Sequence, residues 1–324
     1  MPGFRTHYIF GRRQLKETDT IYAPIRNWPH SYDLGQQGPD IFFYSPPSHI
    51  FYREHLGAIM HGNDTMAFFS ALLDGRDRFI TKDARSICDA YIMGFIGHYT
   101  LDTTVHPYVH YRTRKIKNID RFYYSYGIHV LLETDIDAAL LDRFLHKKPS
   151  EFSCAQTIKI SKKEQAVISL LMSFAIRRTY PGLFTSPWHV SLAISCMRNA
   201  CRLMHDVTGR RKSLVRMLDE RLTGNAFFSS LIATDNHHTY EDPCNLRHRK
   251  WHNPWDESII STDSVYDLMK KAGDSFRHRI SLYRDAATRL SDNYFYCKNA
   301  LLSDLGNASY DTGLEAEQYS CDKG

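Results

Sequence analysis

Histidines and an aspartate recur at helical spacing in one short stretch of the chain, between Gly97 and Pro107. His98, Asp102 and His106 follow one another four residues apart. An α-helix turns about 100° and rises about 1.5 Å per residue, so these side chains would share one face, about 6 Å apart along the axis. Burying imidazoles and a carboxylate without partners is costly, so this pattern favours pairing or metal ligation.

The same face continues upstream as an apolar stripe, which predicts that it points into the core. The stripe consists of Ala84, Ile87, Cys88, Tyr91 and Phe95. Along such a helix the first and last histidine of the triplet lie about 12 Å apart. That is too far for both to ligate one ion at about 2.0 to 2.2 Å. We therefore expect two or more ions, with the aspartate between them.

Further candidate ligands lie on either side of this helix. Asp40 follows a Gly38-Pro39 turn, and His61 lies inside an apolar helical pattern. Taken singly, the first is expected to cap a turn and the second to be a core histidine. His129 and Glu133 are one helical turn apart, a usual two-ligand grip on zinc.

The elements that must position these residues read as helices. The patterns predict helices over residues 53–73 and from 83 to about 105, ending near Pro107, and another opening at Gly127. In the second half we expect a capping box at Ser161, a helix from 188 to 207 with Pro187 in its first turn, and further helices ending near Leu222 and spanning 262–290. The long polar segment 234–263 is expected to be a functional or covering loop.

No strand pattern competes, so the predicted fold is all-α, a multi-helix bundle around a polynuclear metal site. Residues 1–150 would form the metal-site helical core, and 151–305 a helical remainder packed on the same domain. The Gly-, Ser- and acid-rich residues 306–324 are expected to be a disordered tail.

Composition bounds the class of protein. The chain has 324 residues, 43% of them apolar, which suffices for a sizeable core. Its net charge of +5 is too small to indicate a nucleic-acid partner. Seven cysteines without a C-x-x-C pair read as reduced core residues. Because there is no signal-peptide pattern and no transmembrane stretch, we expect a cytoplasmic protein; its oligomeric state is left open.

The ordered set of candidate ligands is harder to obtain by chance than any one of them. It comprises His7, Asp40, His61, His98, Asp102, His106, His129 and Glu133. In this set, and in the His98-x-x-x-Asp102, His106-Pro107 and His129-Val130-x-x-Glu133-Thr134 motifs, the chain resembles the zinc-dependent phospholipase C family. More distantly it resembles the three-zinc single-strand nucleases that share the helical fold. The resemblance covers roughly residues 4–140, and it looks closest to a non-secreted, bacterial-type subgroup.

The resemblance implies two or three zinc ions. Asp40, His61, His98 and Asp102 would hold one; His106, His129 and Glu133 a second; and His7 with bridging Asp102 a third. The secreted enzymes complete the third site with an amino-terminal tryptophan, whereas Met1-Pro2-Gly3-Phe4 precedes His7 here. Candidate substitutes are His237, His238 and His248, or the site is dinuclear. Because the gap after Asp102 is shorter than in the secreted enzymes, His110 is an alternative to His106.

These residues suit hydrolysis of a phosphodiester. Zinc lowers the pKa of a bound water to about 7, so that hydroxide is available at neutral pH. Asp40 would be a ligand and the candidate general base. A phospholipid substrate is favoured, with other phosphodiesters and single-stranded nucleic acid left open. The basic and aromatic segment 110–126 is either a solvated loop packed by its own aromatics or a rim of the substrate pocket, to which Trp251 or Trp255 could add. The alternatives are a nuclease-like phosphodiesterase and a non-catalytic, metal-stabilised binding module.

Overall fold

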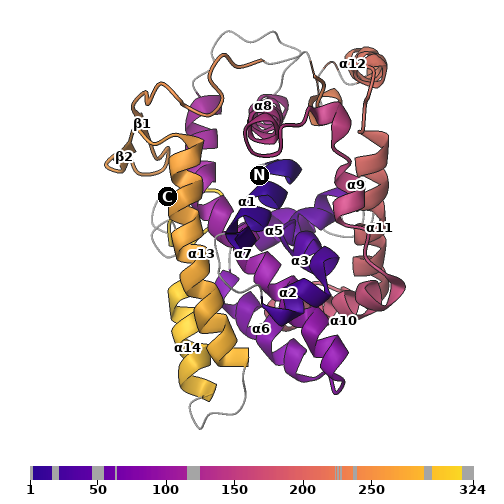
Figure 1. Ribbon diagram of the computed structural model, residues 1–324, viewed down its shortest axis with the longest axis vertical. Helices are drawn as coiled ribbons and strands as arrows, with labels where there is room; N and C mark the ends of the chain where they lie inside the picture. The colour runs from indigo at the N-terminus through magenta and orange to yellow at the C-terminus, as the bar shows by residue number, and fades with distance from the viewer. Residues whose placement is uncertain are drawn as a thin grey trace.

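Helices make up nearly all the regular structure in the computed structural model (Figure 1). It describes residues 3–16, 22–45, 55–62, 64–114, 125–222, 224, 226, 228–235, 239–287 and 294–315. The elements are α1 (Phe4–Lys16), α2 (Ala23–Asn27), α3 (Pro29–Gly35), η1 (Gly38–Tyr44), α5 (Leu56–Gly62), α6 (Thr65–Asp77), α7 (Lys82–Arg114), α8 (Ser125–Leu145), η2 (Pro149–Glu151), α9 (Cys154–Thr157), α10 (Lys162–Thr179), α11 (Pro187–Leu203), α12 (Arg210–Leu222), η3 (Ser229–Leu231), β1 (Trp251–His252), β2 (Ile260–Ser261), α13 (Val265–Ala287) and α14 (Tyr294–Leu305). The predicted all-α class is confirmed, with one short antiparallel pair, β1 and β2, in the described part.

The central element is α7, against which α1, α2, α3, α8, α10 and α13 all pack. In Figure 1, α13 and α14 run along one side of the molecule, and α10 and α11 lie on the other. Every residue from Ile87 to Asp102 is buried. The sequence predicted a single inward stripe, whereas this stretch is enclosed on all sides. A helix apolar all round belongs in the interior of a large bundle, so α7 is the core of the fold.

The crossing of α3 and α7 depends on two glycines. A Cβ on Gly94 would lie 2.2 Å from the Tyr32 carbonyl oxygen, and one on Gly35 would lie 2.2 Å from the Tyr91 carbonyl oxygen. Both neighbours are main chain, so no side chain could move aside. The two backbones therefore touch, and this contact sets how close η1, which follows α3, comes to α7.

The predicted C-terminal boundary of α7 is wrong. We predicted that this helix ends near Pro107, but it continues to Arg114 with Pro107 inside it. Proline removes one hydrogen bond and disfavours a helix interior by about 3 kcal/mol. Here Val105, His106, Tyr108 and Val109 are all buried, and their packing outweighs that penalty.

The second error concerns the segment 53–73, predicted as one helix. It divides into α5 and α6, with Asp64 in the left-handed conformation between them (φ 62°). Residues 46–54 and 63 lie outside the described residues.

Helix boundaries in the second half follow the sequence more closely. The capping box of α10 is confirmed: Ser161 Oγ accepts the Glu164 N–H, and Glu164 Oε2 accepts the Ser161 N–H. Pro187 begins α11 as predicted, but α11 ends at Leu203 rather than near 207. The reason is Asp206, whose carboxylate accepts the N–H groups of residues 208, 209 and 212 and so starts α12.

Residues 306–315, assigned from composition to a disordered tail, are packed against the bundle. Tyr310 is 1% exposed, its N–H donates to the His61 carbonyl, and the Asn253 side chain donates to the Thr312 carbonyl. Residues 316–324 lie outside the described residues. Six cysteines in the described part are free, as expected. No helix in that part is both long enough and apolar enough to cross a bilayer.

Candidate metal centre

Five separate elements bring the predicted ligands together. They come from α1 (His7), η1 (Asp40), α5 (His61), α7 (His98, Asp102 and His106) and α8 (His129 and Glu133). Three groups form, and within each group one ligand atom per residue lies within 4.8 Å of the others. The groups are His7, Asp40 and His98; His61, His98 and Asp102; and His106, His129 and Glu133.

Asp102 is the hub of this arrangement and is fully buried. Its Oδ1 lies 3.1 Å from His7 Nε2, and its Oδ2 lies 3.1 Å from His98 Nε2 and 3.7 Å from His61 Nε2. His106 Nδ1 lies 3.9 Å from the same Oδ2. One carboxylate therefore faces imidazoles on both of its oxygens, as a bridging ligand would.

Main-chain carbonyls orient three of the imidazoles. His61 Nδ1 lies 2.6 Å from the Gly57 carbonyl oxygen, His98 Nδ1 lies 3.1 Å from that of Gln36, and His106 Nδ1 lies 2.8 Å from that of Tyr310. A carbonyl can only accept, so each Nδ1 carries the proton. Each Nε2 then presents a lone pair to the interior of the cluster, which is how a carbonyl-oriented histidine ligates a metal.

These lone pairs face other acceptors. Asp40 Oδ1, both oxygens of Asp102, and the Nε2 atoms of His61, His98 and His106 are buried without a hydrogen-bond partner among the described residues. The His98 Nε2 atom, for example, lies 3.1 Å from Asp102 Oδ2 and 3.9 Å from Asp40 Oδ1. Two hydrogen-bond acceptors this close are unfavourable unless a proton or a cation lies between them. Imidazole nitrogens and carboxylate oxygens are the donors that zinc prefers, so the residues fit zinc.

Gly38 allows Asp40 to join the cluster. Its φ is +48°, and a Cβ there would lie 2.2 Å from His98 Cδ2. Only glycine accommodates both the left-handed backbone and the imidazole against it. The chain then turns into η1, which places Asp40 Oδ1 3.2 Å from His61 Nε2 and 3.9 Å from His98 Nε2.

The start of α1 is tied to α8, and this positions His7. The carboxylate of Asp137 accepts the main-chain N–H groups of Arg5 and Thr6 and the Thr6 hydroxyl. The His7 ring is fully buried and stacks on His98, with ring centroids 4.2 Å apart. Burial and the neighbouring His98 lower the pKa of His7, so its imidazole is neutral.

The two imidazoles of the group on α7 and α8 are in the charge state that a ligand needs. His129 Nε2 lies 2.9 Å from Glu133 Oε1, and His106 Nε2 lies 3.6 Å from the same oxygen. Burial lowers the pKa of His106 and His129 well below the usual range, so both imidazoles are neutral. Burial also raises the pKa of Glu133 well above its usual range, a cost that a bound cation would remove.

The alternatives to His106 and to the third-site ligands are placed differently. His110 lies one turn beyond His106, with its Nε2 3.6 Å from Asp311 Oδ1, and belongs to none of the three groups. His248 is exposed and points to the Thr262 carbonyl, 3.0 Å away, so it does not join the cluster. His237 and His238 lie outside the described residues.

Of the two rim tryptophans, Trp251 is a core residue: it is 5% exposed and its Nε1 donates to the Asp263 carbonyl. Trp255 packs against His110, with ring centroids 4.9 Å apart, and lies beneath the Arg114 guanidinium. Because the His110 ring in turn packs against His129, with ring centroids 4.7 Å apart, Trp255 lies beside the cluster. Residues 115–124 of the predicted aromatic rim lie outside the described residues.

The sequence did not reveal the groups that orient the ligands. The carbonyls of Gln36, Gly57 and Tyr310 belong to residues whose side-chain type carries no signal for this role. Asp311 was likewise missed; its Oδ1 lies 3.8 Å from His106 Nδ1. Burial opposes the shift, but His110 and His106 hold the pKa of Asp311 below its usual range.

Comparison with known proteins gives one match. A family model described as "Zinc dependent phospholipase C" matches residues 6–189, a span of more than half of the chain within which the eight candidate ligands lie. The resemblance inferred from the motifs is thereby confirmed, over a longer span than the motifs cover. No curated protein and no solved structure matches the chain.

Proposed function

The chain belongs to the zinc-dependent phospholipase C family, a family of zinc enzymes of the phosphodiesterase type, and we propose that it hydrolyses the phosphodiester bond of a phospholipid. The proposal rests on the cluster of buried acceptors around Asp102, whose three adjoining groups would hold cations close to one another. Neighbouring cations suit a phosphodiester, because two metal ions can stabilise both the attacking and the leaving oxygen.

We assign the two ends of the cluster to different ions. His61, His98, Asp40 and Asp102 would hold one zinc, and His106, His129 and Glu133 a second. His7 faces Asp102 Oδ1 and would belong to a third ion or share the first. When bound, zinc supplies Lewis acidity toward the phosphate oxygens and lowers the pKa of a water ligand to about 7.

The side chains themselves have distinct tasks. Asp102 joins the groups by presenting its two oxygens to different imidazoles. The three carbonyl-bonded histidines would ligate through Nε2, because each Nδ1–H is held by the main chain. Asp40 has no hydrogen-bond donor on Oδ1 among the described residues, so this oxygen is available to accept a proton from the attacking water as well as to ligate.

A substrate panel tests the reaction. Zinc-loaded protein is assayed on phosphatidylcholine, on a chromogenic phosphodiester and on single-stranded DNA. We expect turnover of phosphatidylcholine and of the chromogenic compound. Activity on DNA alone would replace the phospholipase assignment with a nuclease, and no activity on any of the three would leave a non-catalytic metal-stabilised module.

Asp40→Asn separates catalysis from structure. The change keeps the shape of the side chain, so we expect turnover to fall at least about a hundredfold while the melting temperature stays close to that of the wild type. Asp142→Asn, at an exposed position of α8, is the matched control and should change neither. A large fall in melting temperature with only a small loss of turnover would indicate a structural role instead.

A further inference from the structure

The helix α12 turns an apolar face to solvent. Asp219 is its only buried residue. Leu214, Met217, Leu218 and Leu222 are 54%, 41%, 45% and 79% exposed. Helices of a bundle normally direct such residues inward, and a contiguous exposed apolar patch on a folded protein marks an interaction surface.

The spacing of these residues places them on one side of the helix. Positions 214, 218 and 222 are four apart, and Met217 is adjacent, so together they form a single stripe. The opposite side carries Lys212, Val215 and Asp219, which are the less exposed positions of α12. The apolar face of α12 is therefore directed to solvent, whereas its less exposed face, which packs toward the rest of the protein, carries Lys212 and Asp219.

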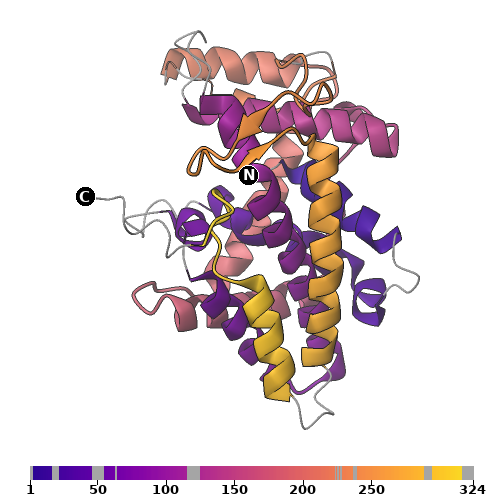
Figure 2. The same cartoon turned by 90° about the vertical axis from the view of Figure 1, so that its left-hand side faces the viewer.

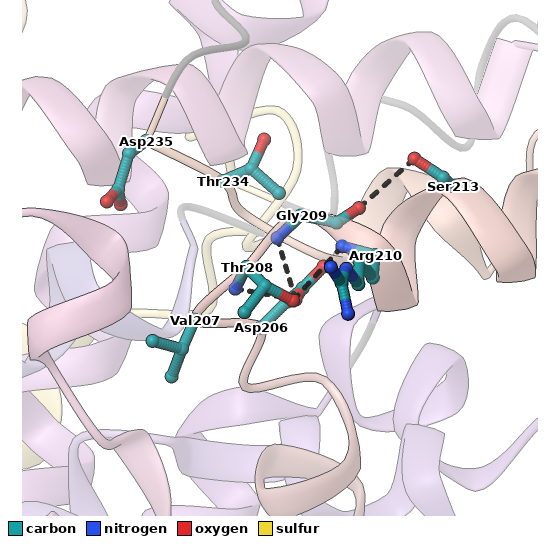
Figure 3. A pocket seen from close by; sticks show the side chains of 8 residues that line it. All are labelled: Asp206, Val207, Thr208, Gly209, Arg210, Ser213, Thr234 and Asp235. Carbon is teal, nitrogen blue, oxygen red and sulfur yellow. Dashed lines mark hydrogen bonds between the residues drawn. The ribbon is translucent and has the colours of Figure 1, made fainter.

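Hydrogen bonds hold α12 in place at both ends. Asp206 accepts the N–H groups of Thr208, Gly209 and Lys212, and Figure 3 shows this carboxylate in the turn before the helix. Near its other end, Asp219 Oδ2 accepts the Ser229 N–H of η3. Both ends of the helix are therefore held, so the exposed stripe is a built feature of the fold.

The pocket in Figure 3 is not itself a ligand site. It lies beside the start of α12, lined by residues 206–210, 213, 234 and 235. Its carboxylates are already used: Asp206 starts the helix, and Asp235 accepts the N–H and hydroxyl of Ser150. The surface chemistry of this region therefore lies on the helix rather than in the pocket.

Basic residues surround the apolar stripe. The thirteen residues of α12 include five cations, Arg210, Arg211, Lys212, Arg216 and Arg221, against two carboxylates, Asp219 and Glu220. Asp219 is engaged with η3 and Glu220 pairs with Arg216 at 3.2 Å. Exposed leucines, with arginines at both ends of the helix, complement a surface whose outer layer is anionic and whose interior is apolar.

We propose that α12 docks the protein onto an anionic phospholipid surface, with its leucine stripe entering the headgroup boundary and its arginines contacting lipid phosphates. This inference rests on the proposed function, which has a phospholipid as substrate. It adds that the protein reaches that substrate in an anionic lipid surface. A second copy of the chain is a poorer occupant. Symmetric pairing of two α12 helices would place arginines against arginines.

The position of α12 suits such docking. It lies at one end of the molecule, next to α8, in both views (Figures 1 and 2). The Thr134 hydroxyl of α8 donates to the Ser230 carbonyl of η3, and α12 contacts η3. Since α8 also carries His129 and Glu133, the docking helix is linked through one short element to the metal cluster.

Vesicle sedimentation tests the proposal. The zinc-loaded protein is mixed with vesicles of pure phosphatidylcholine and of equimolar phosphatidylcholine and phosphatidylglycerol. We expect binding to the mixed vesicles that weakens with salt. The triple variant Leu214→Ser, Leu218→Ser, Leu222→Ser should lose at least about tenfold in vesicle affinity. Arg210→Glu with Arg221→Glu should lose affinity chiefly at low salt.

A matched control is available at the other end of the molecule. Phe295 and Tyr296 on α14 are 77% and 74% exposed, and α14 lies opposite α12 in Figure 1. Phe295→Ser with Tyr296→Ser should leave vesicle binding unchanged. Equal loss in this control would show that any exposed apolar pair suffices, and that α12 has no special role.

Activity readouts separate this proposal from the proposed function. The leucine variant should keep its kcat/KM on a monomeric chromogenic phosphodiester and lose activity only on vesicles. Vesicle binding without any hydrolysis would reject the phospholipase function while leaving the docking surface intact. Absence of vesicle binding, or a dimer in solution that the leucine variant dissociates, would overturn the docking proposal.

Discussion

At the scale of single residues, Asp102 concentrates the chemistry of the cluster. Burial alone would raise its pKa, but the His98, His106 and His7 imidazoles lower it well below the usual range, so the carboxylate is charged. The surrounding imidazoles therefore stabilise the charged form of Asp102, which is the form that ligates a cation. A carboxylate whose pKa is lowered by the fold contributes stability while it is charged, so removing this charge should destabilise the metal-free protein.

Asp102→Asn tests this balance. We expect zinc content to fall, turnover to drop at least about a hundredfold, and the metal-free protein to melt at a lower temperature than the wild type. Elemental analysis and thermal melts with and without chelator measure the three effects. Asp83→Asn, at an exposed position of the same helix, should match the wild type. A metal-free variant that melts at or above the melting temperature of the wild type would contradict the expectation.

The choice between His106 and His110 can also be made at this scale. His106 is fully buried and grouped with His129 and Glu133, whereas the His110 side chain is 22% exposed and faces Asp311. We expect His106→Gln to lose about one zinc equivalent and His110→Gln to lose none. Zinc stoichiometry after gel filtration decides it. The reverse pattern would assign the ligand to His110.

At the scale of elements, the contact between α3 and α7 fixes where η1 delivers Asp40. Gly94→Ala would place a methyl group 2.2 Å from the Tyr32 carbonyl and 2.9 Å from the Gln36 N atom. Because these neighbours are backbone, we expect a loss of about 3 kcal/mol in the free energy of unfolding, measured by urea denaturation. Zinc affinity should fall as well, since the Gln36 carbonyl orients His98.

Gly182→Ala is the matched control for this substitution. Gly182 lies in a turn with nothing within 4 Å of an added Cβ. We expect a change within about 0.5 kcal/mol, in either direction. If both variants behaved alike, the close approach of α3 and α7 would not be the cause of the Gly94 effect.

The elements also show what the sequence could and could not predict. Helical periodicity predicted the shared face of His98, Asp102 and His106, because their positions lie on one helix and depend only on local geometry. It failed at Pro107, where packing of buried neighbours outweighs a local preference. It also failed for residues 306–315, whose order comes from contacts with α5, α7 and the segment near Asn253 rather than from their composition.

At the scale of the whole molecule, the predicted ligands lie far apart in sequence and meet only through the fold. His7 and Glu133 belong to α1 and α8, yet both helices contact α7, which carries Asp102. Side-chain types could be read from the sequence, whereas the carbonyls that orient them could not, because every residue has one. The carbonyl groups that orient the ligands are therefore determined by the tertiary structure alone.

Zinc removal is accordingly expected to loosen one half of the molecule. Ligands that bind only the folded state stabilise it by about 2.7 kcal/mol at a hundredfold excess over the dissociation constant. The cluster joins α1, η1, α5, α7 and α8, whereas α13 and α14 contribute no ligand to it. Chelation should therefore lower the melting temperature and increase amide hydrogen exchange in α1, α5 and α8 more than in α13 and α14.

Residues 306–315 allow a sharper test. The Tyr310 carbonyl accepts from His106 Nδ1, and the Tyr310 N–H donates to the His61 carbonyl, but the segment contributes no ligand to the three groups. If the cations fix the imidazoles, this segment should gain exchange together with α5 and α8 on chelation and recover when zinc is restored. Uniform exchange before and after chelation, with an unchanged melting temperature, would mean that the buried imidazoles and carboxylates are satisfied by one another. The zinc sites assigned to these residues would then be wrong.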